Sequence, residues 1–403
     1  MSAATSSPQP QAAAPAGSGF ALSDDQREIL EQMDRLARKE FHPLQQRMDD
    51  EEWWPEETFK RFGEWGYLGV MAPQELGGAG LDFFASGLVV QAVARWNPAI
   101  ALSLLVHENL CMNNILANGH EALCAKYVPG MCEGRLVGAL GLTEAGAGSD
   151  ALGGMRTTAR RDGDSYVLNG TKLFITNGPI ADLVLVYAKS DIERGAHGIS
   201  AFVLETNTPG FAVSQKLVKM GLRGSQTAEL VFEDCRVPAE NLVGEENRGV
   251  AVVMSGLDLE RVGLAFLILG MAERTLELTI EYARSRRQFG SRIADFQLVQ
   301  GMVADIYADV EALRSFTYCV GAEVNTIAHG ESREYVAKRA AALILQAGRI
   351  FSSVADKALQ VHGGAGYIWE TEINRLYRAG KLWEIGAGTT EIRQLIIAKH
   401  LLG

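Results

Sequence analysis

Apolar residues recur at helical spacing in the first part of the chain. The first set spaced in this way is Ile29, Leu30, Met33 and Leu36. Ser23 or Asp24, just ahead of them, suits a helix N-cap. A proline and three glycines between residues 73 and 80 predict an irregular loop, and Asn97-Pro98 separates two apolar helices. Residues 21–135 therefore predict an N-terminal helical domain.

From about residue 136 to 244 the pattern changes to short β-prone runs. These runs are residues 166–168, 183–187, 200–204 and 229–232. Residues rich in glycine, asparagine and aspartate bound the runs, and we expect turns at 162–164 and at Asn169-Gly170. Close spacing of such runs favours an antiparallel sandwich or barrel over alternating strands and helices.

Helical spacing returns from about residue 246 to the end of the chain, with few prolines. A helix, sheet, helix order predicts a mainly α protein with a central β-domain. The predicted division is a disordered tail at 1–20, helices at 21–135, a β-domain at 136–245 and helices at 246–403.

The bulk composition of the 403 residues is that of an ordinary globular chain, with 47% hydrophobic and 22% charged residues. A net charge of −11 argues against a general nucleic-acid or anionic-membrane binder. It leaves room for an anionic ligand held by helix N-termini and a few arginines. Five cysteines without C-x-x-C spacing indicate a reducing compartment, and seven scattered histidines predict no metal site.

Two segments bear on location. Residues 1–18 carry no charge and match neither a secretory signal nor a mitochondrial presequence, so we expect a disordered tail and a cytoplasmic protein. The apolar stretch at 83–107 is interrupted by Arg95 and Asn97-Pro98. It falls short of the ~20 apolar residues that a membrane span needs.

One carboxylate stands inside an apolar helical stripe. At about 100° per residue, Glu260 shares its helical face with five apolar residues. These are Leu257, Leu264, Leu267, Ile268 and Met271. A buried carboxylate is costly unless it is paired or has a task, and desolvation would raise its pKa toward the range of a general base. The position alone fits either a catalytic base or a structural ion pair with Arg261.

Glycine-rich segments form a second candidate site. One runs from residue 140 to 150, ahead of a strand-like run at 172–178, and two more lie near the C-terminus at 360–367 and 382–393. Glycines are costly in helix-forming sequence unless the backbone must pass close to something. The two C-terminal clusters therefore suggest a large flat ligand whose phosphates meet backbone amides. The 140–150 turn alone is a weak signal.

Together with Arg286 to Gly290 and the later Gln297, these segments resemble the acyl-CoA dehydrogenase family, flavoenzymes that desaturate acyl thioesters. In most members a glutamate base precedes a Gly-Thr pair, and here that position is Ala387. The run from Ser255 to Arg261 is similar to the isovaleryl-CoA dehydrogenase branch, which lacks that glutamate and carries its base on this helix. The resemblance therefore assigns the catalytic base to Glu260.

The resemblance also implies which residues bind FAD. In it, Phe174 covers one face of the flavin ring and the Thr176 hydroxyl lies near N5, while Arg286 and Gln297 reach the FAD of a neighbouring subunit. The implied cofactor-binding set is Leu140, Leu142, Thr143, Gly148, Ser149, Phe174, Ile175, Thr176, Arg286, Gln297, Gln360, Gly363, Gly364, Thr389 and Glu391. The implied substrate-binding set is Ser149, Asp258, Arg261, Ala387 and Gly388.

The resemblance spans residues 21–403 and implies an N-terminal helical domain, an antiparallel β-barrel domain and a C-terminal four-helix bundle, assembled as a homotetramer. The implied reaction is α,β-desaturation of a short branched acyl-CoA such as isovaleryl-CoA, as in leucine or fatty acid catabolism. Glu260 removes the α-proton, the β-hydride passes to flavin N5, and an electron-transfer flavoprotein takes the electrons.

Departures from the branch leave the substrate open. Phe266-Leu267 replaces a small pair, Ala251 replaces an expected aromatic residue, and Ala196-His197 replaces a Ser-Arg pair near the CoA moiety. The alternatives are another branched or medium acyl-CoA, an acyl group tethered to a carrier protein in a biosynthetic pathway, or a non-catalytic flavin-binding scaffold. Glu260 argues against the scaffold.

Overall fold

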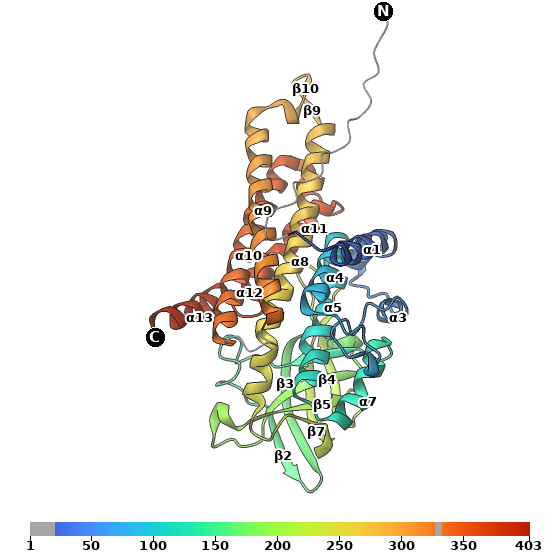
Figure 1. Ribbon diagram of the computed structural model, residues 1–403, viewed down its shortest axis with the longest axis vertical. Coiled ribbons are helices and arrows are strands. Elements are labelled where there is room, and N and C mark those ends of the chain that lie inside the picture. The colour runs from blue at the N-terminus through green and yellow to red at the C-terminus, as the bar shows by residue number, and fades with distance from the viewer. Residues whose placement is uncertain (1–20, 327–332) are drawn as a thin grey trace, which may run out of the picture.

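A computed structural model describes residues 21–326 and 333–403 and arranges them in three parts along the chain (Figure 1). Helices come first, a β-sheet follows, and long helices complete the chain. The sheet lies at one end of the elongated molecule, and the long helices extend away from it (Figure 1). The predicted disordered tail at residues 1–20 lies outside the described residues.

The first part is helical, as predicted. Its helices are α1 (Asp24–Glu40), α2 (Gln45–Glu51), α3 (Thr58–Glu64), α4 (Phe83–Trp96), α5 (Pro98–Leu105), a π-helical segment (Val106–Met112), α6 (Asn113–Asn118) and α7 (Glu121–Cys132). Ser23, the first of the two candidates for this N-cap, caps α1 and forms a capping box with Gln26, while Asp24 lies in the first turn. The Asn97 side chain caps α5 by accepting a hydrogen bond from the Ile100 amide.

The apolar stretch in this part is longer than the sequence suggested. The helix that begins at Pro98 continues through the π-helical segment, and Pro98–Asn118 is long and apolar enough, by length and composition, to cross a membrane. Of its most apolar window, 89% is buried within the fold. A buried core helix passes the same test, and this stretch packs against α4, α8 and β1.

The central part is an eight-stranded sheet. Its strands are β1 (Gly138–Gly141), β2 (Thr158–Asp162), β3 (Ser165–Thr176), β4 (Leu183–Lys189), β5 (Ile199–Glu205), β6 (Phe211–Lys216), β7 (Thr227–Pro238) and β8 (Leu242–Val243). Their order is β6-β7-β3-β2-β4-β5-β8, with β1 beside β4. All four expected runs lie in strands, because their alternate residues fill a core on one face of the sheet.

Two expectations about this sheet were wrong. The sheet is mixed, since β1 and β2 pair parallel with β4, and the described pairs leave β6 and β8 at its two ends without closing a barrel. Long connections along the chain make the parallel pairs possible. In addition, Asn169-Gly170 is a bulge within β3 and not a turn. Gly170 has φ +144°, and a Cβ there would lie 2.6 Å from the Thr157 Oγ1.

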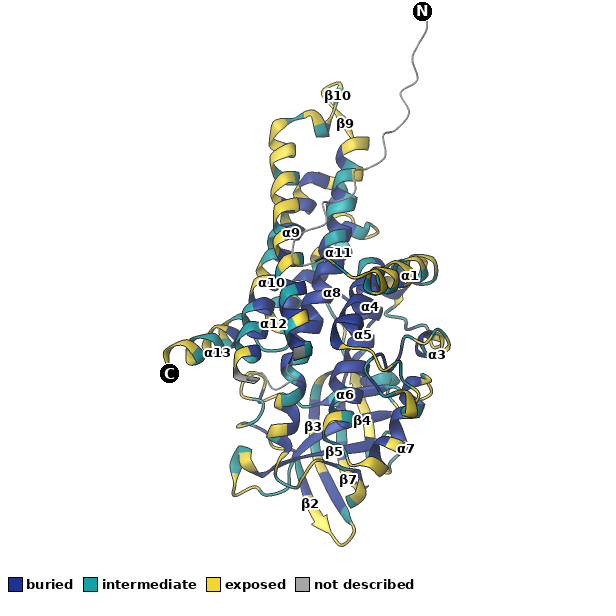
Figure 2. Cartoon of the chain, in the orientation of Figure 1, coloured by how far each residue is buried: buried dark blue, intermediate teal, exposed yellow. Residues whose placement is uncertain are grey.

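The last part is built on three long helices. Its elements are α8 (Gly249–Ser285), the hairpin β9 (Arg287–Gln288) and β10 (Ser291–Arg292), α9 (Gln297–Thr326), α10 (Arg333–His362), α11 (Glu372–Gly380), α12 (Leu382–Ile385) and α13 (Thr390–Leu402). The middle of α8 is buried among α4, α9 and α10, whereas the end that carries β9 and β10 is exposed (Figure 2).

Phe266 shows how α8 fits this core. A Cβ at Gly87 of α4 or at Gly321 of α9 would lie 2.7 Å from the Phe266 ring, so both glycines make room for it. The Phe266 ring also meets the edge of Phe84 at 5.4 Å between centroids. Phe266 lies about 120° around α8 from Glu260, and its bulk therefore fills the helical core.

Candidate functional site

Glu260 lies on α8 where this helix comes very close to the helices before it. A Cβ at Gly256 would lie 2.4 Å from the Asn114 Nδ2, and one at Gly263 would lie 2.7 Å from the Asn109 Nδ2. The glycines precede and follow Glu260 by about one turn, so the α8 backbone around this carboxylate is packed tightly against the Val106–Met112 and α6 segments.

The structural ion pair that we considered for Glu260 is not formed. Arg261 pairs instead with Asp258, at 2.8 Å between Nη1 and Oδ1, and both side chains are buried. Among the described residues, the Glu260 carboxylate has no hydrogen-bond or ion-pair partner. Burying a carboxylate without a partner costs desolvation free energy, so such a group is expected where it has a function.

The surroundings of Glu260 tune its proton affinity. Burial raises the pKa of Glu260 to about 7, against the opposing pull of Arg261 and Arg393. A carboxylate with this pKa is half ionised near neutral pH, and that suits a general base. The Nε of Arg261 and the Nε of Arg393 are both buried without a partner in the described structure. Such unpartnered groups cluster where a ligand or a reacting group completes a site.

Ala387 lies in a turn that Arg393 joins to the surroundings of Glu260. Ala387 has φ +55° and Gly388 has φ +89°, so the backbone is left-handed at two successive residues. Left-handed backbone is strained for alanine and is kept only where neighbouring contacts impose it. Thr389 follows as the N-cap of α13, and the buried guanidinium of Arg393 binds the Gly386 carbonyl oxygen. Local sequence patterns predict no role for Arg393, because its burial depends on α10 and α12.

The glycine-rich segment after β1 is fastened to β3 by a buried ion pair. The Lys172 Nζ lies 2.9 Å from the Glu144 Oε1 and 3.1 Å from the Leu142 carbonyl oxygen. Glu144 also accepts hydrogen bonds from the Arg156 amide and from the amide and hydroxyl of Thr157. The pair therefore closes residues 142–157 into a loop held against the strand, a role that sequence reasoning missed.

The predicted cofactor-binding residues of this loop, and Leu140 just before it in β1, differ in exposure. Gly148 and Ser149 are exposed, and Leu140, Leu142 and Thr143 are half-buried. A Cβ at Gly148 would meet nothing within 4 Å, so its backbone is open to a ligand.

Phe174 is displayed by a bulge in β3. Its backbone has φ +62°, the pairing with β7 shifts between Lys172 and Ile175, and 63% of Phe174 is exposed. An exposed aromatic ring on a strained backbone is expected where a flat ligand stacks. Thr176 is half-buried, whereas the Ile175 side chain is buried in the sheet core. Only the backbone of Ile175 is left to contact a cofactor.

A second group of predicted residues lies far from Glu260. Arg286 follows Glu260 by roughly 40 Å along the helix axis, at the rise of an α-helix. Gln297, Gln360, Gly363 and Gly364 join Arg286 at this end, where Val361 packs with Ala283 and Ile293. All five predicted residues of the group are exposed. One chain therefore does not bring the two groups around a single ligand.

Thr389 and Glu391 begin α13, Thr389 half-buried and Glu391 exposed. The described residues contain no cluster of three or more His, Cys, Asp or Glu side chains that could hold a metal ion.

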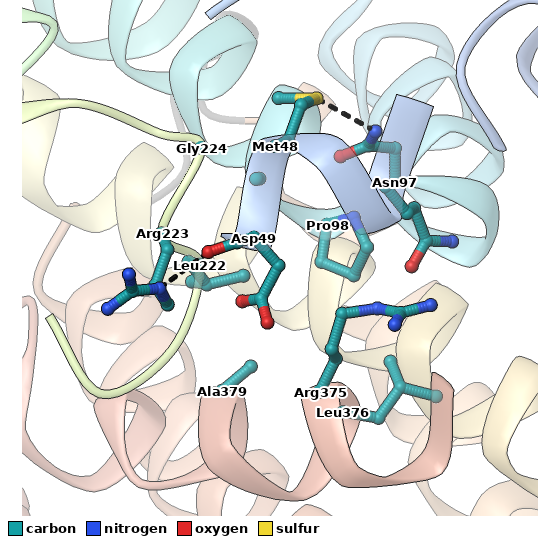
Figure 3. Close-up of a pocket in the computed structure, with 12 residues that line it drawn as sticks. Met48, Asp49, Asn97, Pro98, Leu222, Arg223, Gly224, Arg375, Leu376 and Ala379 are labelled. Carbon is teal, nitrogen blue, oxygen red and sulfur yellow. Dashed lines mark hydrogen bonds between the residues drawn. The ribbon is translucent and has the colours of Figure 1, made fainter. Parts of the chain in front are cut away.

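A small cavity lies where all three parts of the chain meet (Figure 3), and Glu260 is not among the residues that line it. It has a volume of about 30 Å³ and lies between α2, the start of α5, residues 222–224 and α11. Asp49 at its edge is bound by Arg378, and its backbone carbonyl oxygen accepts a hydrogen bond from Arg223. A space of this size holds one or two water molecules, so it is a gap in the packing between the three parts and is too small for a substrate.

Comparison with known proteins places this geometry in a family. The family models described as acyl-CoA dehydrogenase N-terminal, middle and C-terminal domains match residues 23–135, 139–235 and 247–402. Isovaleryl-CoA dehydrogenase, mitochondrial, of Pongo abelii is 41% identical over 382 residues, which cover 94% of this chain and 89% of that protein.

Two further relatives differ in what their names say they act on. 2-Methylacyl-CoA dehydrogenase, mitochondrial, of Solanum tuberosum is 40% identical, with 94% of this chain and 91% of that protein covered. Among solved structures, the prolyl acyl carrier protein oxidase AnaB superposes with a TM-score of 0.89 at 30% identity, covering 95% of this chain and all of that chain.

Proposed function

The chain belongs to the acyl-CoA dehydrogenase family of FAD-dependent oxidoreductases, and we propose that it desaturates a short branched acyl-CoA of the isovaleryl-CoA type. The observation that carries the proposal is Glu260, an unpartnered and partly buried carboxylate with a pKa raised to about 7 on α8. Its position matches the base of the isovaleryl-CoA dehydrogenase branch that the sequence resembles.

The residues present fit FAD. The exposed Phe174 ring offers a stacking surface, and the Thr143 carbonyl oxygen binds the Leu173 amide next to it. Gly148 and Ser149 of the same loop are exposed, and Thr176 is half-buried. Gly363 and Gly364, where a Cβ would meet nothing within 4 Å, leave backbone amides open at the far end of the bundle. Bound FAD would supply the acceptor for the hydride that leaves the β-carbon.

Glu260 would act on the α-carbon of the thioester. In its ionised form it takes the α-proton, because no hydrogen bond within the described residues ties up its oxygens and burial strengthens its basicity. The turn at Ala387 and Gly388, which Arg393 joins to the surroundings of Glu260, would hold the substrate with its backbone. Alignment of the two reacting C–H bonds is then the main contribution of the protein.

A neighbouring subunit would complete the cofactor site. The separation of roughly 40 Å between Glu260 and Arg286 along α8 prevents one chain from using both groups on one FAD. Arg286, Gln297, Gln360 and the Gly363-Gly364 pair would therefore reach a neighbour's FAD, with the arginine pairing with its phosphates. We propose a homotetramer and an electron-transfer flavoprotein as electron acceptor. A cytoplasmic location stays a prediction, to which the five free cysteines conform.

Packing around α8 supports a short branched acyl chain. Phe266, which departs from the branch, points into the α4 and α9 core, away from Glu260. The departure that remains on the Glu260 face is Leu267, two turns further along α8. A leucine there would shorten the space for an acyl chain that extends from Glu260 along this face. The second candidate is a carrier-tethered thioester, which the likeness to the prolyl acyl carrier protein oxidase favours.

Anaerobic bleaching of the flavin absorbance tests these assignments. The panel would contain isovaleryl-CoA, 2-methylbutyryl-CoA, butyryl-CoA, octanoyl-CoA and an isovaleryl group on an acyl carrier protein. We expect rapid bleaching with isovaleryl-CoA and slow or no bleaching with octanoyl-CoA. Bleaching by the carrier-bound thioester alone would establish the second candidate, and none with any thioester would refute the proposed activity.

A further inference from the structure

Arg393 is a buried arginine in the first turn of α13, and only 1% of it is exposed. Its Nη1 donates to the Trp383 carbonyl oxygen at 2.6 Å and to the Ile344 carbonyl oxygen at 3.4 Å. Its Nη2 donates to the Gly386 carbonyl oxygen. The guanidinium therefore binds α12, the turn after it and α10 at once.

This guanidinium has no carboxylate partner within ion-pair distance among the described residues. Other arginines of the bundle do: the buried Arg274 pairs with Glu372 at 2.9 Å, and the half-buried Arg314 pairs with Glu273 at 2.9 Å. Burying a cation against neutral carbonyl oxygens alone is costly. An isolated buried charge of this kind is expected where the charge itself has a use.

The contacts of Arg393 fix the turn that contains Ala387. Carbonyl groups at the end of a helix lack partners within the helix, and Arg393 satisfies those of Trp383 and Gly386 at the end of α12. On the other side of the turn, Thr389 caps α13. The left-handed backbone of Ala387 is thus held from both sides.

Charge balance around Glu260 singles out the same arginine. The charged groups that act on Glu260 are Arg261, on its own helix, and Arg393, on α13. The charge of Arg261 is offset by Asp258 at 2.8 Å. Glu384 of α12 also acts on Arg393, but its carboxylate binds Lys381 and Ser352. The uncompensated positive charge beside Glu260 is therefore that of Arg393.

We propose that Arg393 is a positioning residue for the reaction, which holds the Ala387 turn in place and keeps Glu260 in its ionised form. This inference rests on the proposed role of Glu260 as the base. Without the positive charge, desolvation acts on the carboxylate with less opposition, and a larger share of Glu260 is protonated at neutral pH. Without the forked hydrogen bonds, the turn relaxes and the substrate is aligned less well.

The test measures the ionisation of Glu260 with and without turnover. Thermal unfolding of the FAD-loaded wild type and of Glu260→Gln is compared from pH 5 to 9, since the difference reports the folded-state pKa of Glu260. The same comparison in the Arg393→Gln background should give a midpoint raised by about one pH unit, with flavin reduction about tenfold slower below that midpoint. Arg314→Gln is the control, because it removes a half-buried, ion-paired arginine elsewhere in the bundle. It should lower stability without moving the midpoint.

Arg393→Lys separates charge from geometry. Lysine keeps the charge but not the planar fork, so the pH midpoint should stay in place while the maximal rate falls and KM rises. A midpoint that is unchanged in Arg393→Gln, or that moves in Arg393→Lys or Arg314→Gln, would overturn the inference. If Arg393→Gln does not fold, the midpoint in Arg393→Lys decides. The unfolding comparison needs no substrate, so it gives an answer even if no thioester bleaches the wild-type flavin.

Discussion

The ion pair between Glu144 and Lys172 should hold the loop at 142–157 in the conformation that binds the flavin. Lys172→Met removes the ammonium and keeps a side chain of similar length, so the packing of β3 changes little. It leaves the Glu144 carboxylate buried and bound only by the amides of Arg156 and Thr157 and by the Thr157 hydroxyl.

The expected cost follows from these contacts. Removing one partner of a buried ion pair costs about 3–5 kcal/mol, because the other charge stays buried without compensation. Lys172 is fully buried and also donates to the Leu142 carbonyl oxygen, whereas Glu144 keeps three hydrogen bonds. We therefore expect about 3 kcal/mol, at the lower end of that range. A cost of this size corresponds to roughly a hundredfold increase in the opening of the loop.

Hydrogen exchange of the Arg156 and Thr157 amides measures that opening directly. In Lys172→Met both amides should exchange about a hundredfold faster, and FAD should bind more weakly. Lys357→Met, which removes a partly exposed lysine 3.4 Å from Asp309, is the control and should change protection little. Unchanged protection in Lys172→Met would show that other contacts, and not the pair of Glu144 with Lys172, hold the loop.

Three further predictions concern stability and cofactor binding. Because burial raises the pKa of Glu260 to about 7, the folded chain binds its proton more tightly than the unfolded chain, and the stability that this proton contributes is lost as pH rises from about 4.5 to 7. At pH 8 the free energy of unfolding of Glu260→Gln should therefore exceed that of the wild type by up to ~3 kcal/mol, with a higher unfolding temperature, and near pH 4.5 the two should be alike. An equal gain at both pH values would contradict this origin. Gly87→Ala should destabilise the helical core by about 1–3 kcal/mol, since its Cβ would lie 2.7 Å from the Phe266 ring, and Phe266→Leu in the same chain should restore part of the thermal stability. Arg286→Gln should leave helix content unchanged in circular dichroism but release FAD on dilution, and full retention would argue against a shared cofactor site.

Local patterns predicted the elements of the fold. Ser23, the four β-prone runs and the apolar face of α8 depend on residues within a few positions of one another, and the structure places them as expected. The Asn169-Gly170 bulge was misread, because a glycine that makes room for Thr157 looks the same in sequence as a turn glycine. The parallel pairing of β1 with β4 depends on a long-range contact that strand periodicity does not encode.

In the candidate site, too, local spacing predicted some residues, whereas the roles of others depend on distant contacts. Glu260 could be proposed from helical spacing, but the choice of partner by Arg261 could not, since Asp258 and Glu260 both stand close enough along the chain to compete. Asp258 is three residues before Arg261 and lies on the same side of α8, which favours that pair. Lys172 and Arg393 acquire their roles only through partners from other segments of the chain.

Single-turnover flavin reduction by Glu260→Gln tests most directly whether Glu260 is the catalytic base. The amide is nearly isosteric and cannot accept the α-proton, so the variant should fold, hold FAD and bind the thioester. It should reduce flavin ~10²–10⁴-fold more slowly than the wild type, the usual contribution of a positioned acid–base group. Addition of Ala387→Glu should restore part of the rate, because a carboxylate at 387 would face the same α-carbon. Reduction by Glu260→Gln at the wild-type rate would show that another group is the base.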